Sequence, residues 1–208
     1  MLFAPPLRKL TLTAHVSTSV GWAGAVACFL ALSIAGVGSQ DAQLVRTAYL
    51  AMHLITWWVI VPLCVAALIT GVVQSAGTTW GLLRHYWVAA KLLLTATATI
   101  ILLAHTQPIA AVAALAATST LSSNDLWQLR LQLVGDASAA LFVLFITTAL
   151  SVYKPWGLTP FGVRKLRDAT PAWRPTLRQP SRTRRYIVAA VLAFVLVLLL
   201  IHLAGVSH

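Results

Sequence analysis

The stretch RHYWVAAKLLLTATATIILLAH, residues 84–105, decides the fold class, because it is apolar enough to cross a bilayer yet carries a lysine, Lys91, inside it. A membrane-spanning helix needs about 20 mostly apolar residues. Five segments have this character, near residues 12–37, 47–73, 86–104, 133–153 and 186–205. Because 59% of the 208 residues are hydrophobic and only 9% are charged, we predict an all-α, polytopic membrane helix bundle rather than a soluble domain.

The predicted organisation has three parts. Residues 1–155 form a four-helix membrane bundle, residues 156–185 form a basic, Pro-rich cytoplasmic loop, and residues 186–205 form a fifth, C-terminal transmembrane helix. A further apolar run, PIAAVAALAAT at 108–118, is shorter than a membrane span. We therefore expect that run to be an interfacial or re-entrant helix.

The basic residues are distributed asymmetrically around the predicted spans. Twelve of the 15 Lys and Arg residues fall on one side: Arg8, Lys9, Arg84, Lys154, Arg164, Lys165, Arg167, Arg174, Arg178, Arg182, Arg184 and Arg185. Cytoplasmic loops carry such an excess, so we predict a plasma-membrane protein with its N-terminus in the cytoplasm and its C-terminus outside. The cluster at 164–185 favours contact with anionic lipid head groups over nucleic-acid binding.

Ionisable side chains inside the spans are candidate functional residues, because burying them in hydrocarbon is costly. Each of the first four predicted helices contributes one, namely His15, His53, Lys91 and Asp136. On the third helix the residues Arg84, Trp87, Lys91, Thr95, Thr99 and His105 follow helical spacing and form one broad stripe.

Depth sorts these groups into two pairs. His15 and Lys91 both lie within roughly 8 Å of the cytoplasmic ends of their helices, at about 1.5 Å per residue, so they can meet. His53 and Asp136 lie near the outer side and can meet there, together with His105. Alternatives stay open at this point: Lys91 can snorkel to the head groups, His15 can be an interfacial side chain, and His53 with Asp136 can be a structural pair.

Three segments carry a resemblance to known proteins. HVSTSVGWAGAV (15–26), HLITWWVIVPLCVAALITGVVQSAGTTWGLLRHYWVAAKLLLT (53–95) and LSVYKPWGLTPFG (150–162) resemble actinobacterial integral membrane proteins of unknown function. The first-helix histidine followed by a Trp-x-Gly pattern, and the Trp and Lys that open the third helix, are more distantly similar to the four-helix superfamily of copper-resistance D proteins and HemJ-type protoporphyrinogen oxidases. The resemblance covers roughly residues 10–165.

The superfamily resemblance implies a b-type haem, with His15 and Lys91 as the functional pair. His15 is then the iron ligand, Lys91 is either a ligand or a partner of a propionate, and Trp22 and Trp87 pack on the ring. A quinone or a porphyrin is the implied exchange partner, and the protein is then a membrane oxidoreductase. Copper handling fits less well, because the chain has two Met and two isolated Cys residues.

Two other function classes compete with the redox interpretation. A permease or channel for a metal or small molecule would use a polar path from His53, Asp136 and His105 to Lys91 and His15. A non-catalytic scaffold would use the same groups only to join helices. Hydrolysis by a pair of carboxylates is disfavoured, because the chain has only four acidic residues.

Overall fold

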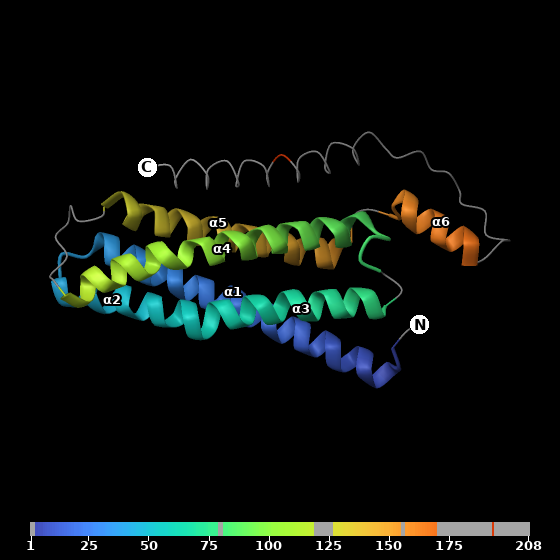
Figure 1. Ribbon diagram of the computed structural model, residues 1–208, viewed down its shortest axis with the longest axis horizontal. Helices are drawn as coiled ribbons and strands as arrows, with labels where there is room; N and C mark the ends of the chain where they lie inside the picture. Colours follow the sequence, from blue (N-terminus) through green and yellow to red (C-terminus); the bar gives the residue numbers. More distant parts are fainter. Residues whose placement is uncertain (1–2, 79–80, 119–126, 155–156, 170–192, 194–208) are drawn as a thin grey trace.

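The computed structural model describes residues 3–78, 81–118, 127–154, 157–169 and 193 of the chain. Within those residues, four rods are long and apolar enough to cross a membrane: Pro5–Gly38, Ala42–Gly77, Tyr86–Thr118 and Trp127–Tyr153. They run up and down side by side as one elongated bundle (Figure 1). The prediction of a polytopic helix bundle is therefore confirmed, whereas the predicted fifth span at 186–205 lies outside the described residues apart from position 193.

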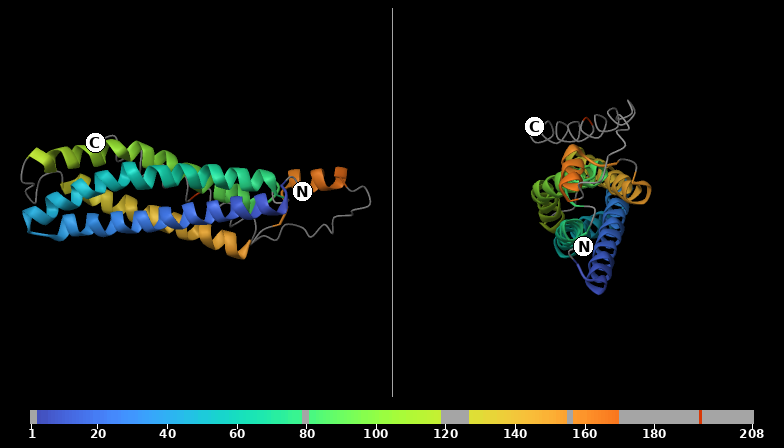
Figure 2. Two further views of the ribbon diagram at one scale, coloured as in Figure 1. Left: turned by 90° about the horizontal axis from the view of Figure 1, so that it is seen from below. Right: turned by 90° about the vertical axis from the view of Figure 1, so that its right-hand side faces the viewer.

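The helices follow one another around the bundle in chain order. Helix α1 (Pro5–Gly38) packs against the second rod, which consists of α2 (Ala42–Ile55), the π-helical turn η1 (Thr56–Ile60) and α3 (Val61–Gly77). Helix α4 (Tyr86–Thr118) packs against that rod and against α5 (Trp127–Tyr153), which returns to α1. The view along the axis shows the four rods around a common interior (Figure 2).

All four rods are longer than the predicted spans, and α4 corrects one prediction. Residues 108–118 are not a separate interfacial or re-entrant helix, because α4 continues through Pro108 to Thr118. Ile109, Val112 and Ala116 are 4%, 0% and 0% exposed, and they belong to the main hydrophobic core. Burial of this face offsets the backbone hydrogen bond that proline removes from a helix interior.

The second rod contains an irregular turn where its helix meets proline. Pro62 stands at the start of α3 and cannot donate a backbone hydrogen bond to the helix. Immediately before it, η1 widens to the π pattern, in which the Val61 N–H donates to the Thr56 carbonyl. The Thr56 hydroxyl donates to the Met52 carbonyl at 2.8 Å. The extra residue in this turn rotates the side chains that follow it relative to a regular helix.

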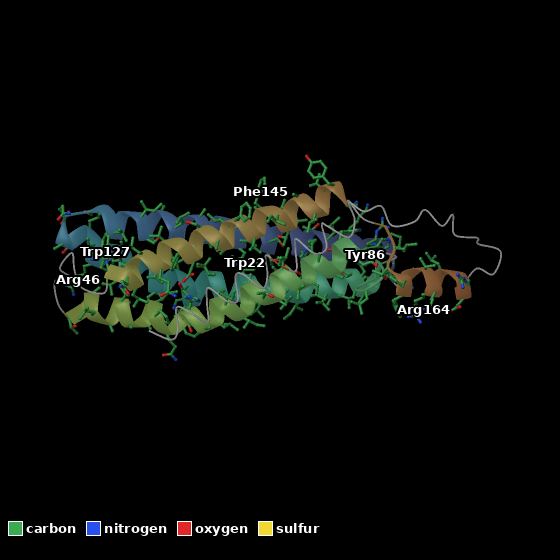
Figure 3. The ribbon with its side chains drawn as sticks, turned by 90° about the horizontal axis from the view of Figure 1, so that it is seen from above. Trp22, Arg46, Tyr86, Trp127, Phe145 and Arg164 are labelled. Atoms are coloured by element: carbon green, nitrogen blue, oxygen red, sulfur yellow. The ribbon has the colours of Figure 1, made fainter. Side chains whose placement is uncertain are left out.

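Two ends of the bundle can be told apart, and we name them for what they contain. The N-terminal end holds the start of α1, the end of α3, the start of α4 and α6 (Pro160–Ala169), whereas the hairpin end holds the α1–α2 connection, the end of α4 and the start of α5 (Figure 1). Figure 3 shows Tyr86 and Arg164 at the N-terminal end and Arg46 and Trp127 at the hairpin end.

Part of the predicted basic loop, residues 156–185, is helical, because α6 lies within it. Thr159 caps α6, accepting from the Gly162 N–H at 3.1 Å and bonding the Arg84 carbonyl through its own N–H at 2.8 Å.

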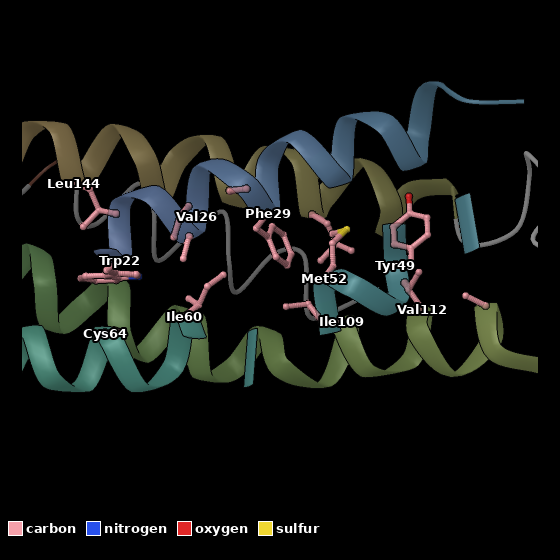
Figure 4. Close-up of a cluster of buried hydrophobic side chains, with 14 of the residues drawn as sticks. Trp22, Val26, Phe29, Tyr49, Met52, Ile60, Cys64, Ile109, Val112 and Leu144 are labelled. Carbon is pink, nitrogen blue, oxygen red and sulfur yellow. The ribbon is translucent and has the colours of Figure 1, made fainter. Parts of the chain in front are cut away.

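The interior and the outer surface are both apolar. Aromatic and aliphatic side chains from all four rods meet in the core, among them Trp22, Phe29, Met52 and Leu144 (Figure 4). The outer face exposes further large apolar side chains, including Val20, Trp58, Ile100 and Phe145. A bundle with an apolar exterior suits a lipid environment, so we treat the chain as a multi-pass integral membrane protein.

A buried arginine ties three helices together near the hairpin end. Arg130 of α5 is 2% exposed. Its Nε donates to the Tyr49 hydroxyl at 2.9 Å and its guanidinium also donates to the Gly36 carbonyl. The guanidinium carbon lies 5.4 Å from the centre of the Tyr49 ring, a cation–π distance. These contacts fix α1, α2 and α5 against one another.

Replacing Gly36 by alanine should destabilise this junction. A Cβ at Gly36 would lie 2.8 Å from Tyr49 Cζ, and the ring is held by Arg130. We expect a loss of about 1–3 kcal/mol from overpacking, seen as an apparent Tm lowered by roughly 5 °C in detergent. Gly24→Ala in the same helix is the matched control, because a Cβ there meets nothing within 4 Å. Equal Tm values for the two variants would contradict the tight junction.

Candidate functional site

The N-terminal half of the bundle contains a partly open cavity of about 510 Å³ between α1, α3, α4 and α5. We call it the N-terminal cavity. His15, Trp22, Trp87 and Lys91 all line it. The four residues that the family resemblance grouped around a haem therefore surround one space. A smaller recess of about 120 Å³ between α3 and α4 shares His15, Trp87 and Lys91 with it.

Lys91 faces the bundle interior. Its Nζ donates to the Ser151 hydroxyl of α5 at 2.6 Å, and Ser151 in turn donates to the Thr147 carbonyl at 2.8 Å. This bond directs the amine across the bundle, away from the lipid-facing surface of α4. Of the two alternatives for Lys91, the structure therefore has the inward side chain rather than the snorkelling one.

His15 is held against α3 through one ring nitrogen. Its Nδ1 lies 3.1 Å from the Ala67 carbonyl and 3.2 Å from the Thr70 hydroxyl. A carbonyl oxygen can only accept, so Nδ1 carries a proton, and in the neutral imidazole Nε2 keeps its lone pair. Gly71 leaves room for the ring, since a Cβ at that position would lie 2.9 Å from His15 Cε1. His15 and Lys91 line one cavity, but their hydrogen bonds go to different helices.

Unsatisfied polar atoms gather around the same cavity. Trp22 Nε1, Gln74 Oε1 and Thr78 Oγ1 are buried without a hydrogen-bond partner in the described part of the chain, and all three residues line the N-terminal cavity. Each such atom costs about 1–3 kcal/mol when no ligand or water satisfies it. Together they offer two donors and one acceptor to a bound molecule.

The charge of the N-terminal cavity is positive. Arg8, Lys91 and Lys154 line it, and no carboxylate does so among the described residues. Arg8 and Lys154 are exposed at its open end, whereas Lys91 is half-buried inside. The cavity is thus an apolar chamber with cations at one side, which suits a ligand that has an apolar body and negatively charged groups.

Of the second predicted group, His53, Asp136 and His105, the structure joins two residues, toward the middle of the bundle. His105 Nε2 lies 2.7 Å from Asp136 Oδ2, and the Gln132 amide nitrogen lies 3.2 Å from the same imidazole nitrogen. His53 is half-buried on α2, and no hydrogen bond between described residues joins it to His105 or Asp136. The predicted meeting of His53 with Asp136 is therefore not formed.

Most of the predicted stripe on α4 faces inward, as the spacing indicated. Trp87, Thr99 and His105 are 8%, 7% and 5% exposed, and the Thr99 hydroxyl lies 3.1 Å from Cys64 Sγ. Sequence reasoning missed Gln74, Thr78 and Ser151 because it considered ionisable side chains first. Gln74 lies one turn after Thr70 on α3, so a search for uncharged polar residues that extends just past the predicted span 47–73 finds it.

No protein-family model, no curated protein and no solved structure matches this chain. The resemblance to the copper-resistance D and HemJ-type superfamily therefore stays a prediction. Within the described residues, no group of three or more His, Cys, Asp or Glu side chains is arranged to hold a metal ion.

Proposed function

We propose that this membrane protein binds an apolar, anionic small molecule in the N-terminal cavity, and that the ligand is a haem-type tetrapyrrole, haem b. The observation that carries the proposal is the composition of the cavity wall. Three unpaired buried polar atoms and three cations belong to the wall of a chamber whose surface is mostly apolar. Its volume of about 510 Å³ falls within the roughly 300–1,000 Å³ of small-molecule and cofactor sites.

The donor set fits the iron of a haem. In its neutral form, His15 donates from Nδ1 to the Ala67 carbonyl and keeps the Nε2 lone pair for a metal ion. Histidines that bind metals usually donate their other ring nitrogen to a carbonyl or carboxylate, which fixes the tautomer and the ring orientation. A neutral imidazole is a common axial ligand of haem iron. His15 is therefore the proposed ligand.

The remaining wall fits the organic part of a haem. Trp22 and Trp87 are 3% and 8% exposed, and they supply aromatic surface to a flat ring. Lys91, with Arg8 and Lys154 at the open end, supplies positive charge for two propionates, as charge-assisted hydrogen bonds require. Lys91 is thus assigned as a propionate partner, held in place by Ser151. A bound b-type haem would supply one-electron transfer, with a quinone or porphyrin as the proposed exchange partner.

The proposal includes an orientation in the plasma membrane. The described cations Arg8, Lys9, Arg84 and Lys154 and those of α6 belong to the N-terminal end, which supports a cytoplasmic assignment for that end. Arg164, Lys165 and Arg167 are exposed on α6, which supports contact with anionic lipid head groups. The fifth span at 186–205, with its end outside, completes this proposed topology.

The proposal is tested by titrating the protein in nanodiscs with haemin and recording the visible spectrum, with protein-free nanodiscs subtracted. We expect a shifted Soret band that saturates at one haem per chain, because one imidazole lines the cavity among the described residues. A spectrum identical to that of haemin in empty nanodiscs would overturn haem binding. It would instead favour the permease or scaffold alternative.

A further inference from the structure

A second cavity lies toward the middle of the bundle, away from the cationic residues. We call this space of about 340 Å³ the central cavity. Its walls come from all four rods, and its polar side chains are Thr56, Thr97, His105 and Asp136. No lysine or arginine lines it among the described residues. Its chemistry therefore differs from that of the N-terminal cavity.

The irregular turn of the second rod forms part of this wall. Thr56 and Ile60 are the first and last residues of η1, and both line the central cavity. π-Helical turns are often found at functional sites, because the register shift costs stability and persists where it shapes a site. On α5, Gly135 also lines the central cavity, and a Cβ there would meet nothing within 4 Å.

Proton accounting shows that the His105–Asp136 pair is electrically neutral. His105 Nδ1 lies 2.8 Å from the Ile101 carbonyl, which can only accept, so Nδ1 carries a proton. The 2.7 Å contact between Nε2 and Asp136 Oδ2 then holds one further proton. Whether this proton is on nitrogen or on oxygen, the sum of the two charges is zero. The central cavity is therefore suited to an uncharged ligand.

The pair leaves one strong acceptor for such a ligand. Oδ2 of Asp136 lies 2.7 Å from His105 Nε2 as an ion-pair contact, and no hydrogen bond from the described residues reaches Oδ1. The Asp136 side chain is 33% exposed and lines the central cavity. When the shared proton is on His105 Nε2, Asp136 is ionised, and a carboxylate oxygen surrounded by apolar walls accepts a hydroxyl proton strongly, because the bond is charge-assisted.

We infer that the central cavity is a second binding site, which takes an uncharged, largely apolar phenol or quinol whose hydroxyl donates to Asp136 Oδ1. The apolar part of the ligand contacts walls such as Phe29, Leu94 and Val143. This inference does not depend on haem binding, because the two cavities have different walls and opposite requirements for ligand charge.

The test compares two probes that differ in one hydrogen-bond donor, a long-chain 4-alkylphenol and its methyl ether. Equilibrium binding is measured to the full chain in nanodiscs, with protein-free nanodiscs subtracted. We expect the phenol to bind at least about tenfold more tightly than the ether, as the loss of a hydrogen bond to a charged group predicts. Equal affinities for the phenol and the ether would overturn the inference, because the central cavity would then act only as an apolar pocket.

Variants locate the preference at Asp136. Asp136→Leu should abolish the preference for the phenol. Asp136→Asn, which keeps the shape but offers a weaker acceptor, should reduce the preference to about threefold. Asp168→Leu, an exposed carboxylate on α6, is the matched control and should keep the full preference, as should His15→Ala. A preference that survives in both Asp136 variants would overturn the assignment, whatever the haemin titration shows.

Discussion

Replacing His15 by alanine should abolish the iron-dependent part of haem binding. The imidazole supplies the only histidine nitrogen on the wall of the N-terminal cavity among the described residues. We expect the Soret band to lose its shift and the affinity for haemin to fall at least about 100-fold, because removing an axial ligand exceeds the 10- to 100-fold cost of disturbing one. The measurement is the haemin titration in nanodiscs.

Two controls separate ligation from folding in this experiment. Metal-free protoporphyrin needs no axial ligand, so His15→Ala should bind it within a few fold of the wild type. His53→Ala removes a half-buried histidine that lines neither cavity, and its Soret band should match that of the wild type. An unchanged Soret band in His15→Ala would show that His15 is not the ligand.

Replacing Lys91 by methionine should weaken binding of anionic tetrapyrroles. Methionine has a similar length and lacks the charge, and the Ser151 hydroxyl loses its donor. Hydrogen bonds to charged groups contribute about 1.5–3 kcal/mol, so we expect a 10- to 100-fold lower affinity for haemin. The Soret position should stay unchanged, because Lys91 is assigned to a propionate and not to the iron.

The control for this variant is a cation outside the cavity. Lys9→Met removes an exposed lysine from α1, next to Arg8 but absent from the cavity wall. It should leave the haemin affinity within twofold of the wild type. If Lys91→Met shifts the Soret band while the affinity stays the same, Lys91 acts on the iron and the assignment to a propionate is wrong.

The two cavities give the bundle two distinct environments along its axis. The N-terminal cavity combines apolar walls with cations, whereas the central cavity contains a neutral ion pair and no Lys or Arg among its described lining residues. Buried charges in a bilayer need partners. In the N-terminal cavity Lys91 donates to the Ser151 hydroxyl, whereas in the central cavity His105 pairs with Asp136. The difference predicts two ligand classes, one anionic and one uncharged.

Helical periodicity and depth were enough to predict which face of α4 carries the polar stripe and at which end of the bundle His15 and Lys91 lie. The spacing from Trp87 to His105 placed the stripe on one face, because residues three and four apart share a face of a helix. The antiparallel order of the spans put His15 and Lys91 at the same end. These are local or topological properties, and the sequence contains them directly.

Other features depended on packing and could not be predicted in this way. The continuation of α4 past Pro108 depends on the burial of Ile109, Val112 and Ala116 against other helices. Arg130 lies in the interior, where it is held by the Tyr49 hydroxyl and the Gly36 carbonyl. Such contacts join residues more than 80 positions apart, so no local pattern indicates them.

The N-terminal cavity should recognise an apolar dianion, and a comparison of metal-free protoporphyrin with its dimethyl ester tests this recognition. Both molecules have the same ring, but only the free acid carries the two carboxylates that the cations at this cavity can bind. With wild-type protein in nanodiscs, we expect saturable binding of the acid that is at least about tenfold tighter than binding of the ester. Equal affinity for the acid and the ester, or no saturable binding of the acid, would contradict this expectation.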